Sequence, residues 1–121
     1  MTEKQNPKKY NLEDRTLEFA KIVRAFVKKL PKTISNFEDI KQLVKASGSV
    51  GANYIEANEA LSKKNFRMRI KTCRKESKES RYWLRLIDTK ETSALEEERV
   101  YLVNESTELM NIFGSILRKS K

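Results

Sequence analysis

Histidine is absent from this sequence, and cysteine occurs only once, as Cys73. A chain without histidine lacks the side chain that most often moves protons near neutral pH, and it cannot form the Glu-x-x-His pairs of di-iron helical bundles. Cys73 has no second cysteine for a disulfide and no histidine to activate its thiol, so we expect a small buried side chain. Phosphate-binding loops of the types G-x-x-x-x-G-K-[ST] and G-x-G-x-x-G are missing too. These absences predict a protein that is not an enzyme and holds no metal or other cofactor.

Glycine and proline are also scarce, at three and two residues among 121, while 36% of the residues are charged and 38% are hydrophobic. This composition predicts long helices, and the length suits one domain of about 100 to 150 residues. No apolar run reaches the roughly 18 residues of a membrane span, and the first ten residues are too polar for a secretory signal. Together with the single cysteine, this favours a cytoplasmic location.

Hydrophobic residues recur at steps of three and four in four blocks, which predicts four amphipathic helices at about 12–30, 35–61, 63–87 and 93–117. Ser35, Ser62 and Ser93 are the expected N-caps, and Glu38 and Glu96 complete capping boxes with the first and last of them. The second block is unusually rich in glycine, alanine and serine, so a neighbouring helix can approach it closely. Its expected buried side extends from Ile40 to Leu61.

Four helices of similar length joined by short connections favour antiparallel neighbours. We therefore predict an all-α fold, an up-and-down antiparallel four-helix bundle spanning residues 12–118. A flexible basic N-terminal tail, residues 1–11, would precede the bundle, and a C-terminal tail, residues 119–121, would follow it.

Positive charge is concentrated in one part of the chain. Residues 63–90 contain eleven cationic and three acidic side chains, a net charge of +8 in a protein whose total is +9. In the third helix, the predicted buried seam consists of Phe66, Ile70, Cys73, Ser77, Ser80, Leu84 and Ile87. Cations follow the seam one residue later, and with the two lysines at the helix start they form what we call the basic stripe: Lys63, Lys64, Arg67, Lys71, Arg74, Lys78, Arg81 and Arg85.

A line of like charges repels itself, so an external anion is expected to compensate it. Lysine and arginine bind nucleic acid by releasing counterions from its phosphates, and nucleic acid is therefore the favoured partner. Three alternatives remain: an acidic protein partner, a solvated face paired with the glutamates at 96–98, and an anionic membrane surface.

Large apolar groups end the third helix on its other shoulder. Tyr82, Trp83 and Leu86 would form an exposed apolar patch unless another chain covers them, which predicts an oligomer interface. Spacing alone equally allows Trp83 to complete the core of its own chain. Tyr82 and Trp83 could also stack on single-stranded bases, because aromatic faces accept any base.

Three stretches of the chain resemble a known family: NLEDRTLEFAKIVRAFVKKLP (11–31), SVGANYIEANEALSKKNF (49–66) and RKESKESRYWLRLI (74–87). They are similar to the four-helix bundle proteins first associated with intervening sequences of bacterial 23S rRNA genes, over about residues 10–118. The resemblance implies a non-catalytic homopentameric ring. A relative in that family is the accessory protein of diversity-generating retroelements, which binds nucleic acid and a reverse transcriptase. RNA or DNA binding is thus the implied function, and an adaptor role for an acidic reverse transcriptase-type partner is the alternative.

The most specific part of the resemblance is Ala52, Asn53 and Glu56 in the crowded second helix. We expect Asn53 and Glu56 to have structural polar roles. A buried glutamate without a partner would be costly, so Glu56 is expected to accept hydrogen bonds or to pair with Arg24 or Arg81.

Overall fold

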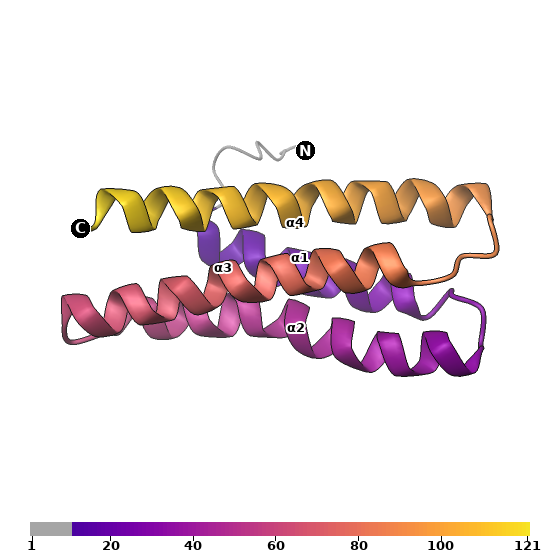
Figure 1. Ribbon diagram of the computed structural model, residues 1–121, viewed down its shortest axis with the longest axis horizontal. Helices are drawn as coiled ribbons and strands as arrows, with labels where there is room; N and C mark the ends of the chain where they lie inside the picture. Colours follow the sequence, from indigo (N-terminus) through magenta and orange to yellow (C-terminus); the bar gives the residue numbers. More distant parts are fainter. Residues whose placement is uncertain (1–10) are drawn as a thin grey trace, which may run out of the picture.

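A computed structural model describes residues 11–121, which form four α-helices: α1 (Leu12–Val27), α2 (Ile34–Asn58), α3 (Lys63–Leu86) and α4 (Ser93–Lys119). Successive helices run in opposite directions, so the molecule is an elongated bundle with the α2–α3 turn at one end and the other two connections at the opposite end (Figure 1). The predicted all-α four-helix bundle is confirmed. Of the predicted N-terminal tail, residues 1–10 lie outside the described part of the chain.

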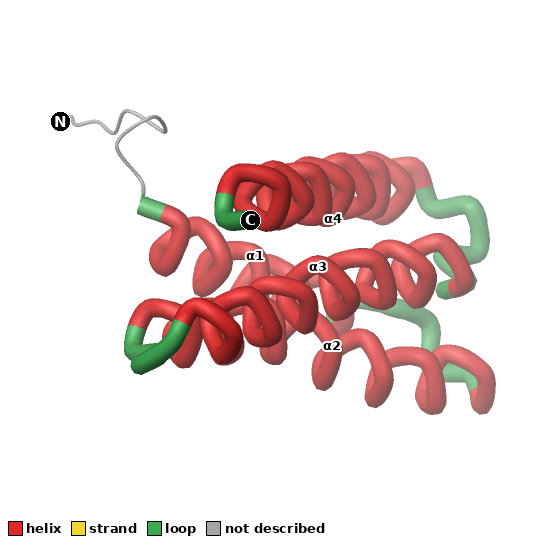
Figure 2. The backbone as a smooth tube through the Cα atoms, turned by 60° about the vertical axis from the view of Figure 1, so that its left-hand side comes forward, coloured by secondary structure: helices red, strands yellow, loops and turns green. Residues whose placement is uncertain are grey.

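Each helix packs against two others. The contacting pairs are α1 with α2, α2 with α3, α3 with α4, and α4 with α1, whereas α1 and α3 are diagonal to each other. Figure 2 shows α4 above α3, with α2 and α3 side by side. The α1–α4 contact is the least extensive of the four.

Two of the three predicted caps are wrong. Ser62 does cap α3, since its hydroxyl accepts a hydrogen bond of 3.1 Å from the Asn65 amide. At α2 the cap is Thr33 rather than Ser35, and its hydroxyl accepts a 3.1 Å bond from the Asn36 amide. Thr92 occupies the cap position of α4 without a side-chain bond. The predicted partner of Ser93, Glu96, is already bonded elsewhere and completes no capping box.

Helix ends also differ from the prediction. The first helix ends at Val27, three residues early, and a turn continues it, in which the Leu30 amide donates to the Val27 carbonyl at 3.3 Å. The second ends at Asn58, so Leu61 lies in the turn to α3 and is 98% exposed instead of buried. The last helix runs to Lys119, one residue into the predicted C-terminal tail.

The predicted seam of α3 lies in the core, which it forms together with buried residues of the other three helices. All seven seam residues of α3 are buried except Phe66, which is half-buried and packs against the core. Serine is tolerated in this seam because each buried hydroxyl donates to a carbonyl one turn back. The bonds from Ser77 to Cys73 and from Ser80 to Glu76 are both 2.8 Å.

Small residues do bring α1 and α2 together, as the sequence predicts. A Cβ added at Gly51 would lie 2.8 Å from the Thr16 hydroxyl of α1, so no side chain fits there without a shift of one helix. No helix among residues 11–121 is long and apolar enough to cross a membrane.

Candidate functional site

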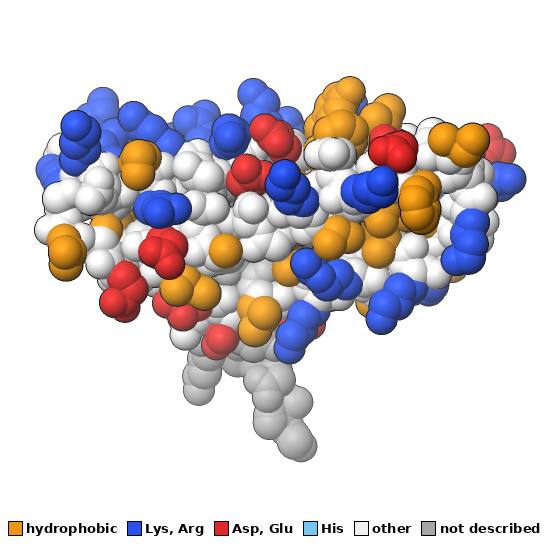
Figure 3. Space-filling model, turned by 90° about the horizontal axis from the view of Figure 1, so that it is seen from below, with side chains coloured by type: hydrophobic (Ala, Val, Ile, Leu, Met, Phe, Trp, Pro, Cys, Tyr) orange, Lys and Arg blue, Asp and Glu red, His pale blue; other side chains and the backbone are white. Residues whose placement is uncertain are grey.

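The basic stripe begins in the first turn of α3 and follows this helix to its last turn. Six of its eight side chains are exposed, and Arg67 and Arg81 are half-buried. Figure 3 views the molecule from the α2 side with α3 along the upper edge, where lysine and arginine side chains gather toward the α2–α3 turn. The helical repeat of 3.6 residues therefore keeps these cations on the outer surface beside the buried seam.

Two arginines of the stripe reach across to α4. The Arg67 guanidinium donates to the Leu117 carbonyl and to the Ser120 hydroxyl, each at 2.7 Å. Arg81 donates to the Thr107 hydroxyl at 3.4 Å. These contacts place the stripe along the α3–α4 junction.

Within residues 11–121, no member of the stripe forms an ion pair with an Asp or Glu side chain, and Lys63 donates to the main-chain oxygen of Lys121, the last residue, at 2.6 Å. The glutamates of α4 are engaged on other sides. Arg15 of α1 binds Glu105 through two nitrogens at 2.8 and 2.9 Å and Glu108 at 2.7 Å. The hydrogen bonds to Glu105 are the main reason that the pKa of Arg15 rises above its ordinary value.

Two of the three predicted alternative partners of the stripe, Glu96 and Glu98, are bound to other residues as well. Lys29 binds both oxygens of Glu98 at 2.7 Å. Glu96 pairs with Arg99 and accepts a hydrogen bond from Thr89, and these contacts lower the pKa of its carboxyl group. The positive charge of the stripe is therefore not neutralised by the acidic start of α4.

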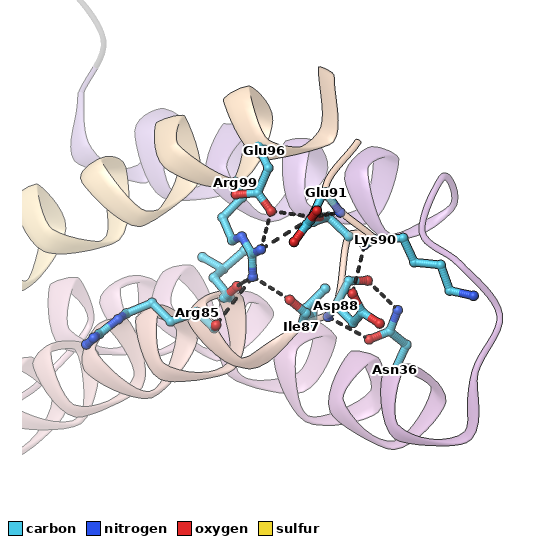
Figure 4. A network of polar contacts seen from close by, with 10 residues as sticks. Asn36, Arg85, Ile87, Asp88, Lys90, Glu91, Glu96 and Arg99 are labelled. Carbon is cyan, nitrogen blue, oxygen red and sulfur yellow. Dashed lines mark hydrogen bonds and ion pairs between the residues drawn. The ribbon is translucent and has the colours of Figure 1, made fainter. Parts of the chain in front are cut away.

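Arg99 of α4 also fixes the end of α3. Its guanidinium donates to the carbonyls of Leu84, Arg85 and Ile87, which are left without helical partners where α3 ends. Figure 4 shows the Arg85 guanidinium pointing away from this network. Asn36 of α2 ties down the following loop by bonding both the amide and the carbonyl of Asp88, at 2.9 and 2.8 Å. The stripe thus ends on a helix terminus that α2 and α4 hold in place.

The sequence interpretation missed several cations on the same surface. Lys75 lines a groove of about 440 Å³ between α3 and α4, together with four members of the stripe: Lys71, Arg74, Lys78 and Arg81. Arg74 of α3 and Arg118 of α4 both lie beside Gly114, with nitrogens 3.9 and 3.5 Å from the point that a Cβ there would occupy. The excess of basic residues at 118–121 and the antiparallel order of α3 and α4 were the signals for this extension.

The predicted oligomer interface divides into two environments. Tyr82 and Leu86 are 57% and 50% exposed. Trp83 is half-buried, packs against the core of its own chain and contacts Tyr82 edge to face, with ring centroids 5.0 Å apart. Trp83 thus contributes to the core, and the exposed part of the patch is Tyr82 with Leu86.

Asn53 links α2 to α3 through its side chain. Its amide donates to the Ser49 carbonyl at 2.9 Å and its oxygen accepts a 2.9 Å bond from Arg69 of α3. The expectation for Glu56 is wrong, because this side chain is exposed. It is not paired with Arg24, which lies over Gly48, or with Arg81, which faces α4. Glu56 needs no buried partner since it lies near the end of α2, where it lines a pocket shared with Arg69.

Two titratable groups of α3 have shifted pKa values. Cys73 is fully buried, its thiol lies 3.4 Å from the Val50 carbonyl, and burial raises its pKa to about 12. On the shoulder that faces α2, burial and the neighbouring Glu79 raise the pKa of Glu76. In the described part of the chain, no three His, Cys, Asp or Glu side chains are grouped so that they could hold a metal ion.

Comparison with known proteins identifies the relatives of this bundle. The profile of the 23S rRNA-intervening sequence proteins matches residues 8–115. A crystal structure of a protein of unknown function from the S23 ribosomal protein family of Bacteroides thetaiotaomicron has a TM-score of 0.76 and 32% sequence identity. The match covers 88% of this chain and 98% of that one. No curated protein matches the sequence. The chain therefore belongs to the family of 23S rRNA-intervening sequence proteins.

Proposed function

We propose that this protein is a non-catalytic nucleic-acid-binding protein and that the basic stripe contacts the phosphates. The observation that carries the proposal is the distribution of ion pairs. Four of the five glutamates of α4 bind Arg15, Lys29 or Arg99, whereas no member of the stripe pairs with an Asp or Glu side chain within residues 11–121. An exposed line of unneutralised cations attracts a polyanion, because each phosphate contact releases condensed counterions.

RNA is the first ligand to test, since the family is named for sequences within 23S rRNA genes. Phosphate contacts carry little sequence information, so we expect affinity that depends strongly on salt and weakly on base sequence. An acidic protein partner would meet the same cations, and the experiments below distinguish the two.

Self-association and a cytoplasmic location belong to the same proposal. Tyr82 and Leu86 expose apolar surface beside the stripe. A second copy of the chain that covers them would remove this surface from water. The resemblance to ring-forming relatives supports a pentamer, in which several stripes would act on one strand.

The direct test is binding of a fluorescently labelled RNA across a salt series to the wild type and to the double variant Lys71→Glu, Lys78→Glu. Both lysines are exposed and make no hydrogen bond in the described structure, so their replacement preserves the fold. We expect at least about tenfold weaker binding, and a slope of log K against log salt that is smaller by about 1.5.

The matched control is Lys21→Glu with Lys28→Glu, which changes the net charge equally. Both lysines are exposed; one lies on α1 and the other directly after it, and α1 is diagonal to α3 in the bundle. Binding that falls equally in both double variants would mean that net charge alone is responsible and would refute the stripe. Binding only to an acidic protein, with no affinity for RNA or DNA at low salt, would replace the proposal by the adaptor function.

A further inference from the structure

The geometry points to single-stranded nucleic acid as the ligand of the basic stripe, and we propose this form of RNA or DNA in preference to a duplex. The inference rests on the proposed function. It depends on two features of the surface that phosphate binding alone does not require: apolar grooves with cationic rims, and carboxylates beside the stripe.

Two grooves lie along the stripe and share Lys71. The first, of about 680 Å³, lies at the start of α3, where Met68 and the stems of basic side chains form an almost wholly apolar lining. The second, of about 440 Å³, lies between α3 and α4, with Met110 and Leu117 among five cations. Each groove therefore has apolar side chains, which we call its floor, beside cationic ones, and the second groove is the more polar of the two.

Such a surface suits a ligand that exposes flat apolar groups and phosphates side by side. A single strand does so, because its unpaired bases can enter a groove while its phosphates stay at the rim. A duplex stacks its bases inside and presents phosphates and sugars to an approaching protein surface. The floors formed by Met68, Met110 and Leu117 would remain empty beneath it.

The positive surface is narrow, because carboxylates lie beside it, and this also favours a single strand over a duplex. Glu76 and Glu79 lie on the shoulder of α3 opposite α4, and Glu79 is exposed. Figure 3 shows acidic side chains among the basic ones along the α3 edge. A single strand can follow the cations past these carboxylates. The second strand of a duplex would lie close to them, and like charges would repel it.

The experiment compares one unstructured 15-nucleotide sequence, as RNA and as DNA, with the blunt duplex that it forms with its complement. Anisotropy titrations with the full chain at a fixed low salt concentration are expected to show single strands bound at least about tenfold more tightly than duplexes. The RNA and DNA arms then identify which single strand is preferred.

Two further variants, each with its own control, test the apolar lining and the neighbouring carboxylate separately. Met68→Ser removes apolar floor without changing charge, and it should weaken single-strand binding several-fold while duplex binding stays the same. The matched control is Leu17→Ser on α1, because Leu17 and Met68 are 52% and 53% exposed. Glu79→Gln should strengthen duplex binding more than single-strand binding, whereas Glu18→Gln on α1 should change neither.

Equal or tighter binding of the duplex in both arms would overturn the single-strand inference and leave the proposed function standing. The single-strand inference would also be overturned, with the proposed function left standing, if Met68→Ser and Leu17→Ser had the same effect on single-strand binding. Failure of every nucleic acid to bind at low salt would overturn both the inference and the proposed function.

Discussion

Individual members of the basic stripe differ in what they touch. Arg67 donates to the Leu117 carbonyl and the Ser120 hydroxyl at the end of α4. Lys71 and Lys78, by contrast, extend into solvent. A guanidinium has five donors in a fixed plane, so it can bind α4 and still offer its charge outward. Replacing Arg67 would therefore reduce stability as well as charge, while replacing the lysines removes charge alone.

Glu76 should make stability depend on pH in the unusual direction for a carboxylate. Its pKa is raised in the folded state by burial, with a contribution from Glu79. The folded chain then holds this proton more tightly than the unfolded chain, so the free energy of unfolding falls as pH rises from about 4.5 through the raised pKa. Glu76→Gln should raise the melting temperature by about 1 to 3 °C at pH 7.

The gain in melting temperature from Glu76→Gln should shrink toward zero at pH 4, where the Glu76 carboxyl group of the wild type is protonated. Glu18→Gln on the exposed side of α1 is the control and should give no such pH dependence. Thermal unfolding followed by circular dichroism measures both variants. A gain that is as large at pH 4 as at pH 7 would contradict the assignment.

Cys73 should be inert to thiol reagents in the folded protein. Its side chain is fully buried and burial raises its pKa to about 12, so almost no thiolate exists at pH 8. We expect alkylation at least about 100-fold slower in buffer than in denaturant, where the pKa returns to about 8.5. Mass spectrometry after a timed pulse of iodoacetamide gives both rates, and rapid labelling of the native chain would show that the seam opens at this position.

At the scale of helices, two glycines of α2 look alike in the sequence and differ in the structure. An added Cβ at Gly51 would lie 2.8 Å from the Thr16 hydroxyl, whereas at Gly48 the nearest atom is the Arg24 guanidinium at 3.3 Å. The Thr16 hydroxyl and Cβ, which lies 3.2 Å away, are held close to the α1 backbone, so they cannot move as easily as the end of an arginine side chain. Gly51 therefore sets the separation of α1 and α2, and Gly48 does not.

The two alanine substitutions should consequently have opposite effects on stability. Gly48→Ala should stabilise by about 0.5 to 1 kcal/mol through helix propensity. Gly51→Ala gains the same propensity but forces α1 outward, and it should destabilise by about 1 to 3 kcal/mol. Urea unfolding of both variants decides the matter, because equal stabilisation would show that α1 and α2 are not closely packed at Gly51.

The helices could be predicted because the seams repeat without interruption, as from Phe66 to Ile87 in α3. Their ends could not, since a cap depends on which of several nearby polar residues has extended backbone. Thr33 and Ser35 are both good caps by type, and only the path of the chain after Pro31 selects Thr33. The sequence pattern places Leu61 in the core because the end of α2 at Asn58 has no distinctive residue.

Across the whole molecule, charge is separated by helix pairing. Carboxylates of α4 are bound at the α1 side and at the α3–α4 connection, and six of the eight cations of the stripe remain exposed. The position of the stripe could be predicted because the seam fixes the rotation of α3. The contribution of Lys75 and Arg118 could not, because it depends on how α4 lies over α3.

The exposed apolar patch of Tyr82 and Leu86 should control the assembly of the protein into an oligomer. We expect Tyr82→Lys with Leu86→Lys to convert the proposed oligomer into a single chain of 14.2 kDa, because two charges replace exposed apolar contacts. Light scattering measures the mass, and Leu17→Lys with Val100→Lys, on exposed positions of α1 and α4, is the control. The fold should persist, since both interface residues are at least half exposed.

The same variant separates the affinity of one stripe from the effect of several acting together. It adds positive charge, so electrostatics alone would strengthen its binding to nucleic acid. If several stripes engage one strand, however, loss of assembly should weaken binding of a 40-nucleotide strand by at least about tenfold and leave a 6-nucleotide strand unaffected, because only the long strand can reach a second stripe. A wild type that already has the mass of one chain, or a variant that binds the long strand more tightly, would show that one subunit acts alone.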